Sequence, residues 1–97
     1  MSKREDEAQS HIHLALSYEK NNLDKCNYHC EEAVKLYHFG SYAYKRLIIY
    51  YVKIKDWENA LRICDTVLDR KKIFNKPTWE AISSYALKRK EYILKKI

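Results

Sequence analysis

The sequence predicts an all-α fold built from antiparallel helical hairpins, and three observations favour it. Apolar side chains recur every three or four residues through most of the 97-residue chain, as they do on one face of an α-helix. The same pattern returns after 33 to 35 residues, which is a length typical of a repeated helical hairpin. One Gly, one Pro and 46% apolar residues suit packed helices better than turns and sheets.

The central hairpin carries the clearest pattern, with helices expected at about residues 42–54 and 57–71. One face of its second helix is formed by Trp57, Ala60, Leu61, Cys64, Val67 and Leu68. The residues 34 positions earlier are Leu23, Cys26, Asn27, Cys30, Ala33 and Val34. Five of these six are apolar or carry a thiol, so the buried face is expected to repeat in the first hairpin.

The first hairpin is expected to contain two helices joined at Asn21-Asn22. Ser2 and Glu5 fit a capping box for a helix that runs to about Lys20. Asn tolerates the left-handed conformation that often ends a helix. The second helix is expected from about Asp24 to His38.

Turn signals also separate the later helices. Gly40 can adopt a positive φ without steric cost, and Ser41 can cap the helix that follows. Asn75 or Lys76 is expected to cap the fifth helix, with Pro77 in its first turn.

The C-terminal residues leave two possibilities open. The fifth helix either continues to the C-terminus or ends in a turn or kink near Lys90, where Lys90-Glu91-Tyr92 matches Lys55-Asp56-Trp57. We favour the turn, with a short last segment. The chain is therefore expected to contain five or six helices.

The order of residue types resembles the tetratricopeptide repeat (TPR) family. The central copy has the family's aromatic, large apolar, Tyr, aromatic and Ala positions at Tyr44, Leu47, Tyr51, Trp57 and Ala60. The likeness covers about residues 8–97, although Ile48 replaces a small residue and His11 an aromatic one. It implies a single domain with an α-α superhelix, divided into repeats at about residues 3–40 and 41–74 and a partial or capping repeat at 75–97.

Charge is unevenly distributed along the chain. Residues 1–69 carry 10 basic and 11 acidic side chains, whereas residues 70–97 carry 9 and 2, a local net charge of +7. This basic block either keeps the exposed end of a repeat array soluble or attracts an acidic protein or nucleic acid. With no long apolar run and no apolar leader, the chain is expected to be cytoplasmic and not to bind membranes.

The sequence contains no arrangement that favours catalysis or metal binding. Cys26, Cys30, His29, His11 and His13 have a spacing that could form a zinc site, but both Cys positions also belong to the repeating buried face. We expect no metal, no cofactor, no structural disulfide and no enzymatic nucleophile paired with a base.

The TPR resemblance implies a groove lined by the first helix of each hairpin. The residues that would line it as a peptide-binding site are Ile12, Leu16, Lys20, Tyr42, Lys45, Arg46, Ile49, Val52, Lys53, Leu87 and Lys88. Lysines beside apolar side chains suit an acidic or amphipathic peptide. Alternatively, the lysines only complement helix C-termini, and the apolar residues serve self-association.

A non-catalytic module for protein–protein interaction is therefore the function that the sequence favours. The partner would be a protein or peptide segment, and an acidic one is expected. Two alternatives remain at this point, namely a homo-oligomeric scaffold and binding of nucleic acid through the basic C-terminal third.

Overall fold

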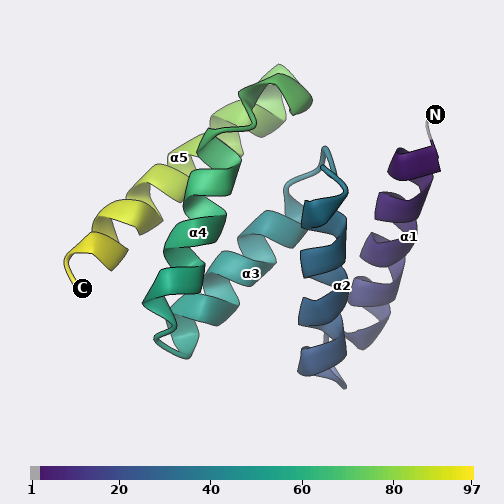
Figure 1. The fold of residues 1–97 in the computed structure, drawn as a ribbon, viewed down its shortest axis with the longest axis horizontal. Coiled ribbons are helices and arrows are strands. Elements are labelled where there is room, and N and C mark those ends of the chain that lie inside the picture. The colour runs from purple at the N-terminus through teal and green to yellow at the C-terminus, as the bar shows by residue number, and fades with distance from the viewer. Residues whose placement is uncertain (1–2) are drawn as a thin grey trace. The chain divides into compact units, whose positions relative to one another are not determined.

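The computed structural model describes residues 3–97, so Ser2 of the expected capping box lies outside the described part. The chain is all-α (Figure 1). The described residues form α1 (Lys3–Tyr18), α2 (Leu23–Lys35), α3 (Tyr42–Lys53), α4 (Trp57–Leu68), the short 3₁₀ helix η1 (Lys71–Ile73) and α5 (Lys76–Leu94). The predicted class is confirmed, and the boundaries of α1 to α4 differ from the expected ones by up to three residues.

Contacts divide the chain into two compact units, Met1–His38 (unit 1) and Phe39–Ile97 (unit 2). Each unit is described by itself below.

Unit 1 is an antiparallel pair of helices, α1 and α2, with a core of small side chains. Its buried apolar residues are Ala8, Ile12, Ala15, Cys26, Cys30, Ala33 and Val34. Ala and Cys dominate this list, and small side chains allow two helix backbones to approach closely. The face predicted from the 34-residue repeat is thus buried, except that Leu23 is exposed.

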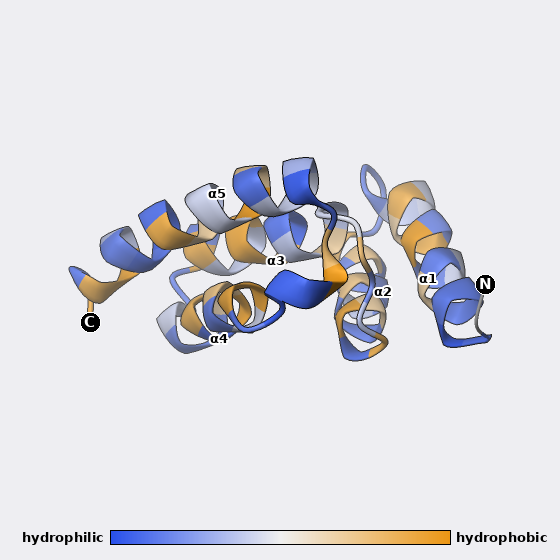
Figure 2. Cartoon of the chain, turned by 90° about the horizontal axis from the view of Figure 1, so that it is seen from above, coloured by the Kyte–Doolittle hydropathy of each residue, from blue (hydrophilic) through white to orange (hydrophobic). Residues whose placement is uncertain are grey.

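Unit 2 contains α3, α4 and α5, and α4 packs along both of its neighbours. The core includes Tyr44, Leu47, Ile48, Ala60, Ile63, Cys64, Val67, Phe74, Ile82, Ala86 and Ile93. Figure 2 shows that each of these helices carries both hydrophobic and hydrophilic residues. This is the amphipathic pattern from which the sequence predicted them.

The segment between α4 and α5 is anchored on buried Tyr44. Arg70 donates a hydrogen bond from its guanidinium to the Tyr44 hydroxyl at 3.2 Å. The ring of Phe74 meets Tyr44 edge-on at 5.4 Å between centroids and stacks on Trp79 at 6.1 Å. These contacts tie the connector to the core of unit 2.

The predicted left-handed turn residues were wrong. Gly40 does not have a positive φ, and neither Asn21 nor Asn22 does; the left-handed residues are Tyr37 (φ 58°) and Lys55 (φ 60°). Each follows a helix C-cap and closes it with paired backbone hydrogen bonds. After α2, for example, the N–H groups of residues 37 and 38 donate to the carbonyls of residues 34 and 33. This hydrogen bonding compensates for the strain of a left-handed residue other than Gly.

The predicted caps were correct at one helix and wrong at another. Asn75 accepts a hydrogen bond from the Thr78 N–H at 2.9 Å, and Pro77 lies in the first turn of α5. Ser41 precedes α3 but its side chain makes no capping hydrogen bond, because its backbone is already helical (φ −86°, ψ −17°).

The expected turn near Lys90 is absent, and α5 continues without a break to Leu94. Lys, Arg and Glu in this region all favour helix. Lys90 also forms an ion pair with Asp65 of α4, at 2.7 Å between Nζ and Oδ1, so the helix continues alongside α4. A third complete hairpin is therefore not formed.

Candidate functional site

The eleven predicted groove residues are distributed over both units. Ile12, Leu16 and Lys20 belong to unit 1, and the other eight belong to unit 2. In unit 1, Leu16 is exposed, whereas Ile12 is only 5% exposed and belongs to the helix–helix core. Ile12 therefore offers almost no surface to a partner. Lys20 lies two residues beyond the end of α1.

In unit 2 the predicted residues form a mixed basic and apolar stripe on α3. Lys45, Ile49 and Lys53 are spaced four residues apart, so they share one face of the helix, and all three are exposed. Ile49 is 42% exposed. Tyr42 and Val52, close to the same face, are partly exposed.

Helix α5 contributes an adjacent set of residues. Leu87 is 51% exposed, and Lys88 next to it is also exposed. α3 and α5 contact each other, and Lys45 Nζ lies 5.1 Å from the centre of the Tyr85 ring on α5. Lys88 lies one turn after Tyr85 on the same side of α5, whereas Leu87, two residues from Tyr85, lies on the other side of this helix. We call Lys45, Ile49, Val52, Lys53 and Lys88 the α3–α5 face, which does not include the predicted Leu87.

Cations and tyrosines alternate along α5 beside this face. Arg89 lies over the rings of both Tyr85 and Tyr92, at 5.5 and 6.0 Å, and Lys96 lies 5.2 Å from the Tyr92 ring. These cation–π contacts use the ring faces that a nucleic-acid binder would offer to bases. The observed geometry thus favours a structural role for these cations, which pack against the tyrosine rings of α5.

Arg46, the remaining predicted groove residue, differs from its neighbours. Its side chain is only partly exposed, and its Nε atom is buried. It therefore contributes less to the surface of α3 than Lys45 does.

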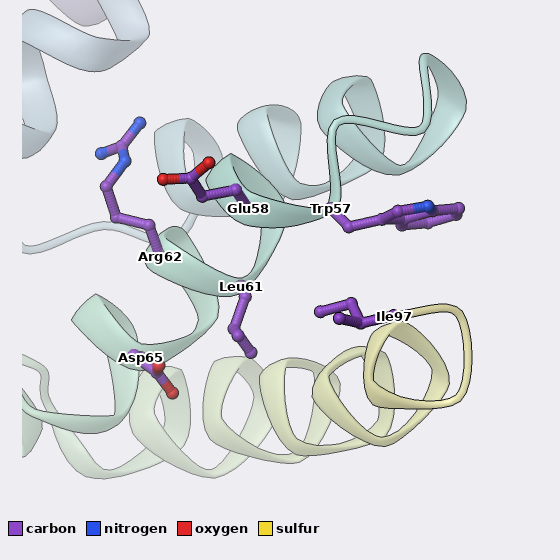
Figure 3. A pocket seen from close by; sticks show the side chains of 6 residues that line it. All are labelled: Trp57, Glu58, Leu61, Arg62, Asp65 and Ile97. Atoms are coloured by element: carbon purple, nitrogen blue, oxygen red, sulfur yellow. The ribbon is translucent and has the colours of Figure 1, made fainter.

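A pocket that the sequence did not predict lies between α4 and the C-terminal end of α5 (Figure 3). Its volume is about 480 Å³, and it is lined by Trp57, Glu58, Leu61, Arg62, Asp65 and Ile97. Leu61 points from α4 toward α5, and Ile97 points back toward it. The sequence pattern places Trp57 and Leu61 in the repeat core, so Ile97, which follows the end of α5, is the apolar lining residue that could have indicated this surface.

The part of the chain covered by residues 3–97 offers no group of three His, Cys, Asp or Glu side chains that could hold a metal ion. All three Cys are buried and none is in a disulfide. Burial raises the pKa of the Cys64 thiol to about 11, and neighbouring Asp65 acts in the same direction. At neutral pH this thiol is therefore protonated and a poor nucleophile.

None of the helices within residues 3–97 is long and apolar enough to cross a bilayer. No protein-family model, curated protein or solved structure matches this chain.

Proposed function

We propose that this chain is a non-catalytic module for protein–protein interaction that binds an acidic or amphipathic peptide segment. The single observation that carries the proposal is the α3–α5 face of unit 2. There, exposed Ile49 and partly exposed Val52 lie among three exposed lysines. Apolar side chains supply the contact area, and the lysines select a partner with carboxylates.

The finer fold that we propose is a short TPR-like array. Tyr44, Leu47 and Ala60 occupy positions of the TPR pattern and are buried. In such an array the first helices of successive hairpins, here α3 and α5, line one surface. The contact between α3 and α5 supports this arrangement.

Each contact contributes only a small binding free energy. An exposed ion pair contributes at most about 1 kcal/mol, so three lysines together change affinity by about 10- to 100-fold. Burying Ile49 and Val52 adds an apolar term that does not depend on salt. Binding should therefore weaken, but not disappear, as the salt concentration rises.

The test is an affinity capture from nuclease-treated native lysate with the natural chain and a Lys45→Glu, Lys53→Glu, Lys88→Glu variant. A matched control, Lys71→Glu, Lys72→Glu, Lys76→Glu, makes the same charge change elsewhere in unit 2. We expect proteins that the natural chain and the control capture and the first variant does not. If both variants lose the same proteins, the net charge of the chain explains the capture, and the α3–α5 face is not the binding site.

A second candidate, self-association, is favoured by the pocket between α4 and α5. Ile97 is 73% exposed beside it, and Leu94 is also exposed. Two copies could cover this apolar surface. Light scattering should then show a mass that rises with concentration and stays monomeric in an Ile97→Asp variant. A monomeric natural chain at high concentration would eliminate this candidate.

A further inference from the structure

Two histidines face each other between the helices of unit 1. Nδ1 of His11 on α1 lies 2.9 Å from Nδ1 of His29 on α2, which is a hydrogen-bond distance. The ring centroids are 5.1 Å apart. Both side chains are partly buried, and the peptide-binding function proposed above does not use them.

Two tyrosines contact the ring of His29. Tyr18 of α1 stacks on His29 with centroids 6.0 Å apart and planes 6° from parallel. Tyr28 of α2 meets the His29 ring edge-on at 5.0 Å. These contacts restrict the orientation of His29, so its Nδ1 remains directed at His11.

The charged groups around His29 come from both helices. His11 lies on α1, and Lys25 and Glu32 lie on α2. Lys25 is positioned over the Tyr18 ring at 5.1 Å, and Glu32 forms an ion pair with Lys35 at 3.0 Å. The Glu32 carboxylate therefore already has a cation of its own as partner.

A hydrogen bond between two Nδ1 atoms depends on the protonation of both rings. One nitrogen must donate a proton, and the other must accept with a lone pair. Two neutral rings can satisfy this condition, and so can a pair that holds one extra proton. When both rings are protonated, neither Nδ1 can accept, and two cations face each other at close range.

We propose that His11 and His29 form a pH-sensitive switch that joins α1 to α2 near neutral pH and is released when both rings become protonated. The first added proton preserves the hydrogen bond and the second breaks it. The transition therefore belongs to the pair and not to either ring.

The direction in which the stability of unit 1 changes with pH follows from the pKa of His29. Its burial lowers the pKa of His29 from the usual 6.5; His11 and Lys25 act in the same direction, and Glu32 opposes them. His29 takes up its proton near pH 6.5 in the unfolded chain, whereas in the folded hairpin its lowered pKa delays this proton until a lower pH. Between pH 6.5 and that lower pH, the unfolded state binds more protons than the folded state. Unit 1 therefore loses stability as the pH falls below 6.5.

The direct test is nitrogen-15 NMR of the imidazole rings in the natural full-length chain, with EDTA present to exclude bridging metal ions. At pH 8 we expect a protonated Nδ1 on one ring, an unprotonated Nδ1 on the other, and a scalar coupling between them. At pH 5 both Nδ1 atoms should be protonated and the coupling absent. Two rings that both carry their proton on Nε2 at pH 8 would overturn the proposal.

A double-mutant cycle then measures the strength of the pair. His11→Phe, His29→Phe and the double variant keep aromatic rings but remove the hydrogen bond. We expect a favourable coupling of about fivefold in the exchange protection of the Ala15 and Cys30 amides at pH 8, and no favourable coupling at pH 5, where two cations repel each other. A coupling that is equal at both pH values would contradict the switch.

Two controls accompany this cycle. His13→Gln changes an exposed ring on the same helix and should leave the pH response of unit 1 unchanged. Buried His38, whose pKa burial also lowers, is present in every variant, so its contribution cancels. Amides of unit 2, such as those of Leu47 and Ile63, provide an internal reference within each sample.

Discussion

At the scale of single residues, Asn27 is the least favourable member of the core of unit 1. It is 7% exposed, and neither its Nδ2 nor its Oδ1 has a hydrogen-bond partner. Burying an amide without partners costs about 1–3 kcal/mol. The repeat pattern has Leu61 at the corresponding position of the second hairpin, so an apolar residue suits this site.

We therefore expect Asn27→Leu to increase the free energy of unfolding of unit 1 by about 1–2 kcal/mol, measured by hydrogen exchange. The matched control is Asn59→Leu in α4. Asn59 donates to Asp56 at 2.8 Å, and its replacement should cost about 1 kcal/mol. A loss of stability in Asn27→Leu would show that the amide has a partner in solution.

At the scale of helices, the two left-handed C-terminal residues explain how the chain turns with so little glycine. Tyr37 and Lys55 adopt φ values near 60°, at a cost of about 1–2 kcal/mol each for a residue with a Cβ. The sequence predicted a break between helices at Lys55 but not its conformation, and it placed Tyr37 inside a helix expected to run to His38. Gly40 lies three residues after Tyr37, yet Tyr37 takes the positive φ and closes α2 with backbone hydrogen bonds.

Lys55→Gly should stabilise unit 2 by about 0.5–1 kcal/mol, because Gly adopts this φ without steric strain, although the unfolded chain gains entropy. In contrast, Glu91→Gly within α5 should destabilise it by about 1 kcal/mol. Chemical denaturation of both variants gives the comparison. Equal destabilisation by both would show that Lys55 is not left-handed in solution.

The helix caps allow a second comparison. Asn75→Ala removes the hydrogen bond to the Thr78 N–H and should cost about 1 kcal/mol. Ser41→Ala should change stability by less than about 0.5 kcal/mol, because the Ser41 side chain makes no capping hydrogen bond. Thermal unfolding of the two variants separates these cases; a larger effect at Ser41 would contradict the observed cap geometry.

At the scale of the whole molecule, the sequence predicted the helical class and most helix positions, because amphipathic periodicity alone determines both. It could not predict that α5 continues past Lys90. Residues 90–92 resemble the residues of an earlier turn, but they are helical here. Good helix formers and the ion pair between Lys90 and Asp65 stabilise the helix at this point.

The candidate site stays a prediction, but the structure shows where its residues lie. The TPR resemblance implied Lys45, Ile49 and Lys53, and all three are exposed on one face of α3. Spacing could not show that Ile12 is buried between helices, or that Ile97 meets Leu61 across a pocket. Both depend on how far one helix extends along another, which a pattern within a single helix does not encode.

The most direct test of the proposed function is an NMR titration of the nitrogen-15-labelled chain with an amphipathic peptide that alternates Glu or Asp with Leu. A peptide with Lys in place of each acidic residue serves as the control. The account predicts saturable shifts at Lys45, Ile49, Lys53 and Lys88 with the acidic peptide alone, weakened about 10- to 100-fold by the triple Lys→Glu substitution. Shifts confined to other surfaces, or equal shifts with both peptides, would contradict it.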